Sequence, residues 1–171
     1  AGKSTLASAL LKEGYPFITD DLIVIKQNTN GQYCIISGPA QLKLWRDAAL
    51  HLDHDIEHAQ AVNLKTDKYV IPVTHYSDMS MIPIAAFYEL NTASQATTFT
   101  CERLADTLSL RTLINNAYRY FMLKPLGKLQ FFMNDCCQLA QKIAVNKIIR
   151  RPDLSELPQI IKRIELDQGE T

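Results

Sequence analysis

The first residues that could do chemistry are Gly2-Lys3-Ser4-Thr5, which have the form of the end of a phosphate-binding loop. A complete loop reads G-x-x-x-x-G-K-[ST], so its first glycine would lie upstream of Ala1. In such a loop, backbone N–H groups face the phosphates, Lys3 reaches the β- and γ-phosphate oxygens, and the Ser4 hydroxyl binds Mg²⁺. A chance tetrapeptide at a helix start is the alternative. The Ala- and Leu-rich segment that follows favours the phosphate loop.

A second candidate is the acid pair Asp20-Asp21, which stands between FIT and LIVIK. A P-loop phosphotransferase needs a carboxylate near its metal, and a kinase uses a base for the attacking hydroxyl. Two adjacent acids could divide these tasks, whereas a solvated pair in a turn is the alternative. The apolar flanks and the nearby GKST segment favour the catalytic interpretation.

Taken in order, these motifs resemble the catalytic domain of the HPr serine kinase/phosphorylase superfamily, in particular its short members from bacterial peptide-biosynthesis clusters. The residues that carry the resemblance are GKSTLASALL, Gly14-Tyr15, Thr19-Asp20-Asp21 and SGPAQLKLW, with Gly38-Pro39 and Leu42-Lys43-Leu44-Trp45. The likeness continues more weakly to the end of the chain.

The resemblance implies an α/β fold with a P-loop core like that of the HPr kinase C-terminal domain and of phosphoenolpyruvate carboxykinase. It also implies an ATP- and Mg²⁺-dependent serine kinase. Gly2, Lys3, Ser4 and Thr5 would then bind the nucleotide. Ser4 and Asp20 would hold the metal, and Lys3, Asp20 and Asp21 would be catalytic. Asp21 is our choice for the base, although the order of the two acids stays open.

The acceptor implied by the resemblance is a serine of a protein or peptide, which in some members is the C-terminal serine of a lasso-peptide precursor. Lys43 and Arg46 could offer cations to a phosphate or a peptide carboxylate. Solvent-facing charges on an amphipathic helix, with Trp45 in the core, are the alternative. The glycine-rich signature that follows the acids in true HPr kinases has no equivalent here, which argues against HPr as the substrate.

Two other functions stay open: a kinase of a small molecule or amino acid on the same scaffold, and a nucleotide-binding regulatory module that transfers nothing. The second acid favours a kinase, because a binder needs only one metal-side carboxylate. A metal site at His51, His54 and His58 is disfavoured, since their surroundings lack the H-E-x-x-H pattern. Four arginines could belong to an anion site or a subunit contact, although solvent exposure is the commoner fate: Arg111, Arg119, Arg150 and Arg151.

Composition, and in one case the family resemblance, gives our expectations for domain number, partners, location and oligomeric state. The 171 residues, 47% of them hydrophobic, suit a single catalytic domain over 1–171, whose first strand and early P-loop would lie upstream. Lys+Arg and Asp+Glu both total 18, so bulk charge favours neither nucleic acid nor membrane as a partner. The four cysteines form no C-x-x-C pair and no apolar run is long enough for a bilayer, so we expect a cytoplasmic protein. Rings formed by related HPr kinases suggest a homo-oligomer.

Hydrophobic periodicity predicts the elements that position these residues. We expect helices over 4–12, 40–52, 110–121, 132–143 and 154–164, the last three making the C-terminal half largely helical. We expect strands over 15–19, 22–27, 32–38, 68–73, 81–90 and 146–151, with a polar loop over 53–68.

Overall fold

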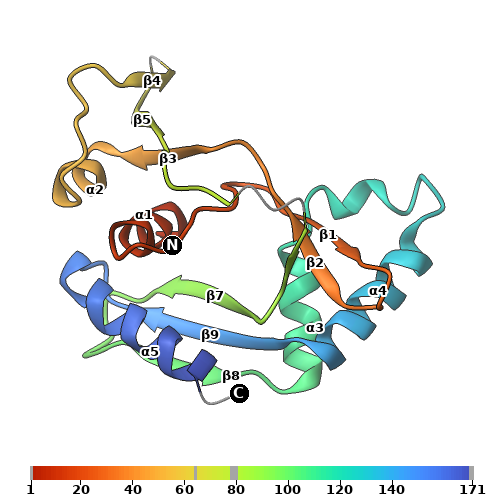
Figure 1. The fold of residues 1–171 in the computed structure, drawn as a ribbon. Coiled ribbons are helices and arrows are strands. Elements are labelled where there is room, and N and C mark those ends of the chain that lie inside the picture. The colour runs from red at the N-terminus through yellow and green to blue at the C-terminus, as the bar shows by residue number, and fades with distance from the viewer. Residues whose placement is uncertain (1, 64, 78–80, 170–171) are drawn as a thin grey trace. The chain divides into compact units, whose positions relative to one another are not determined.

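The computed structural model describes residues 2–63, 65–77 and 81–169. They form two compact units, one of Ala1–Pro83 with Pro152–Thr171 and one of Ile84–Arg151. Five α-helices and three three-stranded sheets are present in the described ranges, which agrees with the expected mixed α/β class (Figure 1). The expectation of one catalytic domain stays a prediction, and the two units are taken in turn.

The first unit begins with helix α1 (Lys3–Lys12), which confirms the helix expected over 4–12. Gly2 precedes it with a φ of 83°, a left-handed conformation that costs glycine little. Gly14 follows the helix with a φ of 96°, and the N–H groups of Gly14 and Tyr15 bond to carbonyls of the last turn. A glycine in this conformation is a common way for a helix to end.

Two antiparallel sheets follow α1 in this unit. The first has the order β1 (Val24–Gln27), β2 (Tyr33–Ile36) and β6 (Ile82–Pro83). The second has the order β3 (Gln41–Trp45), β5 (Thr66–Pro72) and β4 (Gln60–Asn63). The core of the unit lies between the second sheet and its helices and contains Phe17, Leu42, Leu44, Ala49, Ile71 and Val73.

The helix expected over 40–52 is wrong in its first half. Residues 41–45 form β3, and only Arg46–His51 are helical, as α2. The alternation in QLKLW explains the strand, because Leu42 and Leu44 are buried while Gln41 and Trp45 face outward. Trp45 is 52% exposed, so the alternative that placed it in the core is wrong. The second half of the expected loop over 53–68 forms β4 and the start of β5.

The unit closes with a short 3₁₀ turn, η2 (Leu154–Glu156), and helix α5 (Leu157–Gly169). The Asp153 carboxylate caps this turn by accepting a hydrogen bond of 2.9 Å from the Ser155 N–H. At the end of α1, the Tyr15 hydroxyl donates a hydrogen bond of 2.6 Å to Glu165 on α5. This bond joins the two ends of the chain within one unit.

The second unit has a sheet of order β7 (Ala86–Thr92), β9 (Ala144–Arg150) and β8 (Thr100–Arg103). β9 pairs in parallel with β7 and antiparallel with β8, and its Val145 and Ile148 are buried. The stretch 81–90 is apolar enough for a central strand, but among the described strands β7 lies at the edge and β9 takes the centre. The strand expected over 146–151 is confirmed.

Helices α3 (Asp106–Asn115) and α4 (Leu129–Lys142) pack against β9 in this unit, with a 3₁₀ turn η1 (Tyr120–Met122) between them. The first expected helix therefore ends earlier than 121, at two consecutive asparagines, and Arg119 has a left-handed φ of 48°. No helix within 2–63, 65–77 and 81–169 combines the length and apolarity needed to cross a bilayer.

Candidate active site

The start of α1 presents the four residues of the GKST motif. The helix opens with a hydrogen bond of 3.0 Å from the Leu6 N–H to the Gly2 carbonyl. The Lys3 side chain is exposed, that of Ser4 is half-buried, and Thr5 lies in the core at 7% exposure. Lys3 and Ser4 are therefore the members of the motif whose side chains can reach a ligand.

Ser4 and Asp20 are in direct contact. The Ser4 hydroxyl donates a hydrogen bond of 3.1 Å to Oδ1 of Asp20. The other oxygen, Oδ2, accepts a bond of 3.1 Å from the backbone N–H of Lys43 on β3. One carboxylate thus joins the helix of the first motif to the strand of the third, so both of its oxygens are fixed.

Asp21 is held in a different way. Its backbone has a φ of 47°, in the left-handed region that aspartate tolerates better than most residues. Its Oδ2 accepts a hydrogen bond of 2.7 Å from Nζ of Lys43, and the two side chains are 55% and 36% exposed. Because the pair is open to solvent, we expect it to contribute only about 0.2–1 kcal/mol to stability.

The electrostatics of this pair act mainly on Asp21. The hydrogen bond from Lys43 lowers the pKa of the Asp21 carboxyl, and burial opposes this shift. The charges of Lys43, Lys68 and Lys3 lower the pKa further. The same hydrogen bond and the charge of Asp21 raise the pKa of Lys43. Both groups are therefore charged at neutral pH, and Asp21 is available as a hydrogen-bond acceptor.

Close packing of the second and third motifs fixes the turn that carries the acids. The Gly38 N–H bonds to the Ile18 carbonyl at 3.1 Å. A Cβ on Gly38 would lie 2.2 Å from Oγ1 of Thr19 and 2.8 Å from its Cβ, so only glycine fits here. Thr19 in turn donates a hydrogen bond of 3.2 Å to the Leu22 carbonyl. The glycine of the third motif thus positions the T-D-D turn of the second.

The structure brings together most of the residues singled out from sequence. Ser4, Asp20, Asp21 and Lys43 form one connected group. Arg46 starts α2 and is exposed, and no hydrogen bond or ion pair of the described residues connects it to the acids.

Sequence reasoning missed the role of Lys43 and the presence of Lys68. It assigned Lys43 to the substrate, whereas this lysine holds Asp21 with its side chain and Asp20 with its backbone. It also missed Lys68, which pairs with Trp45 across β3 and β5 and places its ammonium 5.9 Å from the centre of the Trp45 ring. Reading QLKLW as a strand would have put Lys43 and Trp45 on one face, and this is the signal that was overlooked.

The histidines lie elsewhere in this unit. Nε2 of His54 is 2.7 Å from the Ser8 hydroxyl on α1, and beside it Lys12 pairs with Asp53 at 2.6 Å. No group of three His, Cys, Asp or Glu side chains with the spacing of a metal site occurs in the part of the chain that the structure describes.

The donor set at the start of α1 fits a magnesium–nucleotide complex. Mg²⁺ prefers hard oxygen ligands and commonly takes one or two protein groups, together with phosphate oxygens and waters. A hydroxyl and a carboxylate 3.1 Å apart, as in Ser4 and Asp20, supply such oxygens. Comparison of the chain with protein-family models, with curated proteins and with solved structures gives no match.

Proposed function

We propose that this chain is an ATP-dependent serine kinase of the HPr-kinase-like type, which transfers the γ-phosphoryl group of Mg-ATP to a serine hydroxyl of a protein or peptide. The observation that carries the proposal is the hydrogen bond of 3.1 Å between Ser4 and Asp20. A hydroxyl at the start of the loop helix and an acid from a following segment are the protein groups that hold Mg²⁺ in P-loop enzymes. Because the proposed reaction uses ATP, we place the proposed kinase in the cytoplasm.

The nucleotide would be bound by the start of α1. Backbone N–H groups of the first turn have no partner within a helix and attract phosphate oxygens. Lys3 is exposed beside them and offers its ammonium to the β- and γ-phosphates. Ser4 and Asp20 would hold the metal ion, which supplies charge neutralisation at the phosphates. Gly2 lets the chain enter the helix in a left-handed conformation.

Asp21 is the group that would orient the acceptor. Its lowered pKa keeps it ionised, so it can accept a hydrogen bond from a serine hydroxyl and take its proton. In the reaction the serine oxygen forms a bond to the γ-phosphorus, the bond from that phosphorus to the β–γ bridging oxygen breaks, and ADP leaves. A weak base suffices because the transition state is loose and depends mainly on positioning and charge. Lys43, freed from Asp21, could contact the transferred phosphoryl group.

A nucleotide-binding regulatory module is the second candidate, and one observation favours it. The carboxylate of Asp21 is already engaged by Lys43, so the second acid could be a purely structural partner. A kinase of a small metabolite is compatible with the same contacts, because nothing at the acids selects the acceptor. The proposed kinase would act alone or as a homo-oligomer.

The deciding experiment is transfer of label from γ-labelled ATP with Mg²⁺ by the full-length protein. The acceptors offered are peptides ending in serine, an HPr-like protein and free serine, and nucleotide binding is measured in parallel. The variants are Asp20→Asn, Asp21→Asn and, as a matched control, Asp53→Asn, which also loses a lysine partner but lies away from the two acids. We expect transfer to a peptide that Asp53→Asn keeps and Asp21→Asn loses while still binding ATP.

Other outcomes are equally decisive. Tight ATP binding without transfer to any acceptor would favour the regulatory module. Label on free serine alone would favour the small-molecule kinase. Absence of ATP binding would refute every nucleotide-based function, including the proposed one.

A further inference from the structure

The charges of this neutral chain are divided unequally between the two compact units. The unit Ile84–Arg151 has an excess of cations over acids, and the rest of the chain has the opposite excess. Its acids are Glu89, Glu102, Asp106 and Asp135. Its cations are Arg103, Arg111, Arg119, Lys124, Lys128, Lys142, Lys147, Arg150 and Arg151. No acid occurs between Asp106 at the start of α3 and Asp135 within α4, so every charged side chain of the stretch between these two residues is basic.

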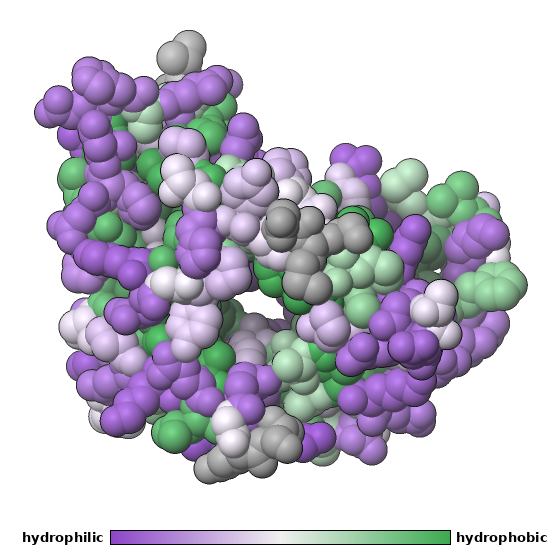
Figure 2. All heavy atoms as spheres, in the orientation of Figure 1, coloured by the Kyte–Doolittle hydropathy of each residue, from purple (hydrophilic) through white to green (hydrophobic). Residues whose placement is uncertain are grey.

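The same connection exposes large apolar side chains. Phe121 is 69% exposed and Phe131 is 68% exposed, values unusual for phenylalanine. The set of exposed apolar side chains in this segment is Tyr118, Tyr120, Phe121, Met122, Leu126 and Phe131. We call segment 118–131 the aromatic-basic surface; at the right of Figure 2, apolar and polar side chains lie next to each other over this part of the molecule. Gathered exposed apolar groups of this kind mark interaction sites.

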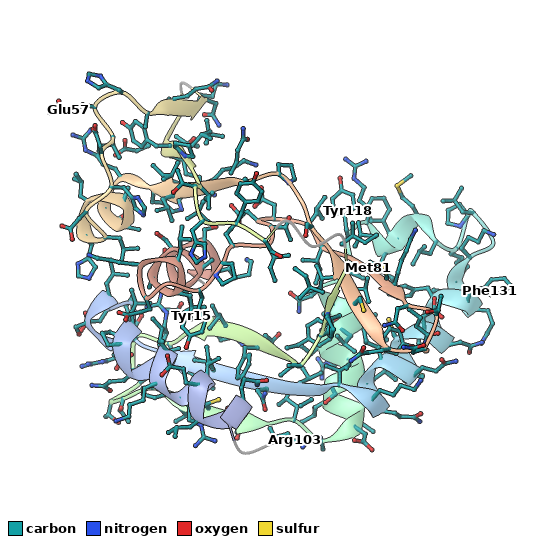
Figure 3. All side chains as sticks on the ribbon, viewed as in Figure 1. Tyr15, Glu57, Met81, Arg103, Tyr118 and Phe131 are labelled. Atoms are coloured by element: carbon teal, nitrogen blue, oxygen red, sulfur yellow. The ribbon has the colours of Figure 1, made fainter. Side chains whose placement is uncertain are left out.

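Two cations of the segment lie beside its exposed rings. The Arg119 guanidinium lies 5.0 Å from the centre of the Tyr118 ring, and Nζ of Lys128 lies 5.6 Å from that of Phe131. Figure 3 labels Tyr118 and Phe131, which come from the two ends of the segment. A partner that covers these rings would therefore meet a cation beside each of them.

The backbone of the segment is held in place before any partner arrives. Within it, the Met122 N–H bonds to the Arg119 carbonyl at 2.9 Å, and the Lys128 N–H bonds to the Leu123 carbonyl at 2.9 Å. The exposed side chains are therefore carried on defined turns, which lowers the entropy cost of binding. Earlier in the sequence than the segment, one face of α3 forms a shallow, open groove lined by Thr107, Leu110, Arg111, Ile114 and Asn115.

Charge and shape select the kind of partner. A second copy that used the same surface would set cations against cations, because an isologous contact places a patch against itself. A peptide chain can present carboxylates and apolar side chains next to each other, which matches the cations that lie beside exposed rings in this segment. We propose that the aromatic-basic surface, with the groove on α3, docks an acidic peptide segment that carries apolar side chains.

In such a complex the apolar side chains of the peptide cover the rings of the surface, and its carboxylates meet the neighbouring cations. Arginine at the groove offers a bidentate contact to a carboxylate. Aromatic and arginine side chains are the residues that most often dominate binding energy at protein interfaces. The docking proposal does not depend on ATP or on the acids of the candidate active site.

The test uses the full-length protein and a fluorescein-labelled peptide in which glutamates alternate with leucine and phenylalanine, followed by fluorescence anisotropy. The matched peptide has glutamine in place of every glutamate. We expect the acidic peptide to bind, the glutamine peptide to bind at least about tenfold more weakly, and the affinity to fall with added salt.

Substitutions within the aromatic-basic surface test whether the peptide binds there. Phe121→Ala with Phe131→Ala removes rings, and Lys124→Glu with Lys128→Glu reverses charge. Each pair should weaken binding by about tenfold or more. The matched controls are Leu166→Ala and Lys26→Glu, which change an exposed apolar and an exposed basic residue of the other unit. They should leave the affinity unchanged, and circular dichroism checks that every variant is folded.

Three results would overturn the proposal. One is equal binding of the acidic and glutamine peptides. Another is binding to vesicles of anionic phospholipid without binding to the peptide, which would assign the surface to a membrane. The third is a dimer in light scattering that the ring variants dissociate while no peptide binds, which would assign the surface to a second copy. Because no arm contains ATP, failure here leaves the proposed kinase activity standing, and the reverse also holds.

Discussion

Replacing Lys43 separates its two contacts. In Lys43→Met the side chain keeps its length but loses its charge, so the hydrogen bond of 2.7 Å to Asp21 disappears. The backbone N–H remains, so the bond of 3.1 Å to Asp20 should persist. We therefore expect a variant in which Asp21 is released and Asp20 still contacts Ser4.

The exposure of the two side chains sets how much unfolding free energy the loss of this pair should cost. The two side chains are 36% and 55% exposed, so solvent screens the pair and its loss should cost about 0.2–1 kcal/mol of unfolding free energy. The pKa of Asp21 should rise in the variant, because the hydrogen bond and charge of Lys43 are the main causes of its low value. A carboxyl whose pKa is lowered by folding adds stability above its unfolded pKa, and this stability is lost as the pH falls through the folded pKa. The wild-type advantage over Lys43→Met should therefore be present at neutral pH and disappear in acid.

The assay is an NMR titration of the Asp21 side-chain carboxyl, together with urea unfolding at neutral and acidic pH. The matched control is Lys12→Met, which breaks a pair of similar length, 2.6 Å, between Lys12 and Asp53. It should raise the pKa of Asp53 and leave that of Asp21 unchanged. An Asp21 pKa that stays the same in Lys43→Met, or that moves equally in Lys12→Met, would refute this account of the site.

Three further predictions concern packing and burial. Gly38→Ala should destabilise the protein by roughly 1–3 kcal/mol in urea unfolding, because the new Cβ would overlap Thr19; a change below the error of the measurement would contradict the packing described. Burial lowers the pKa of His54 below its usual 6.5, so the unfolded state binds more protons near that pH, and the free energy of unfolding should fall as the pH drops from about 7 to 5. His54→Gln should flatten this dependence, and an unchanged slope would count against it. Burial raises the pKa of the Cys136 thiol to about 11, so iodoacetamide at pH about 8 should modify it more slowly than the half-buried Cys137, as mass spectrometry of labelled peptides would show.

Local signals predicted the elements whose residues carry strong preferences. The Ala- and Leu-rich helix α1 with Gly14 behind it, the strand β9 and the cap at Asp153 all follow from short-range chemistry. These features depend on neighbours in sequence, so one sequence suffices to find them.

Features that depend on distant partners were not predicted. QLKLW has helix-forming residues, yet pairing with β5 makes it a strand, since Leu42 and Leu44 then enter the core together. The position of β7 at a sheet edge depends on β9, which lies far away in sequence. For the candidate site, the sequence singled out Asp20, Asp21 and Lys43 but did not predict their pairing. The contacts of Lys43 with both acids form only when β3 packs against the T-D-D turn.

That pairing bears on the order of the two acids, which the sequence left open. Both oxygens of Asp20 are held, by the Ser4 hydroxyl and by a backbone N–H, so this acid could leave its place only by breaking contacts between α1 and β3. Asp21 has one exposed ion pair and a left-handed backbone, a conformation that is often retained where a side chain must point outward for function. A metal-side ligand has to be rigid, whereas a base has to approach the acceptor and release it. If the proposed kinase activity is correct, these contacts suit Asp20 to the metal and Asp21 to the serine hydroxyl, and Lys43 would hold Asp21 until the acceptor binds.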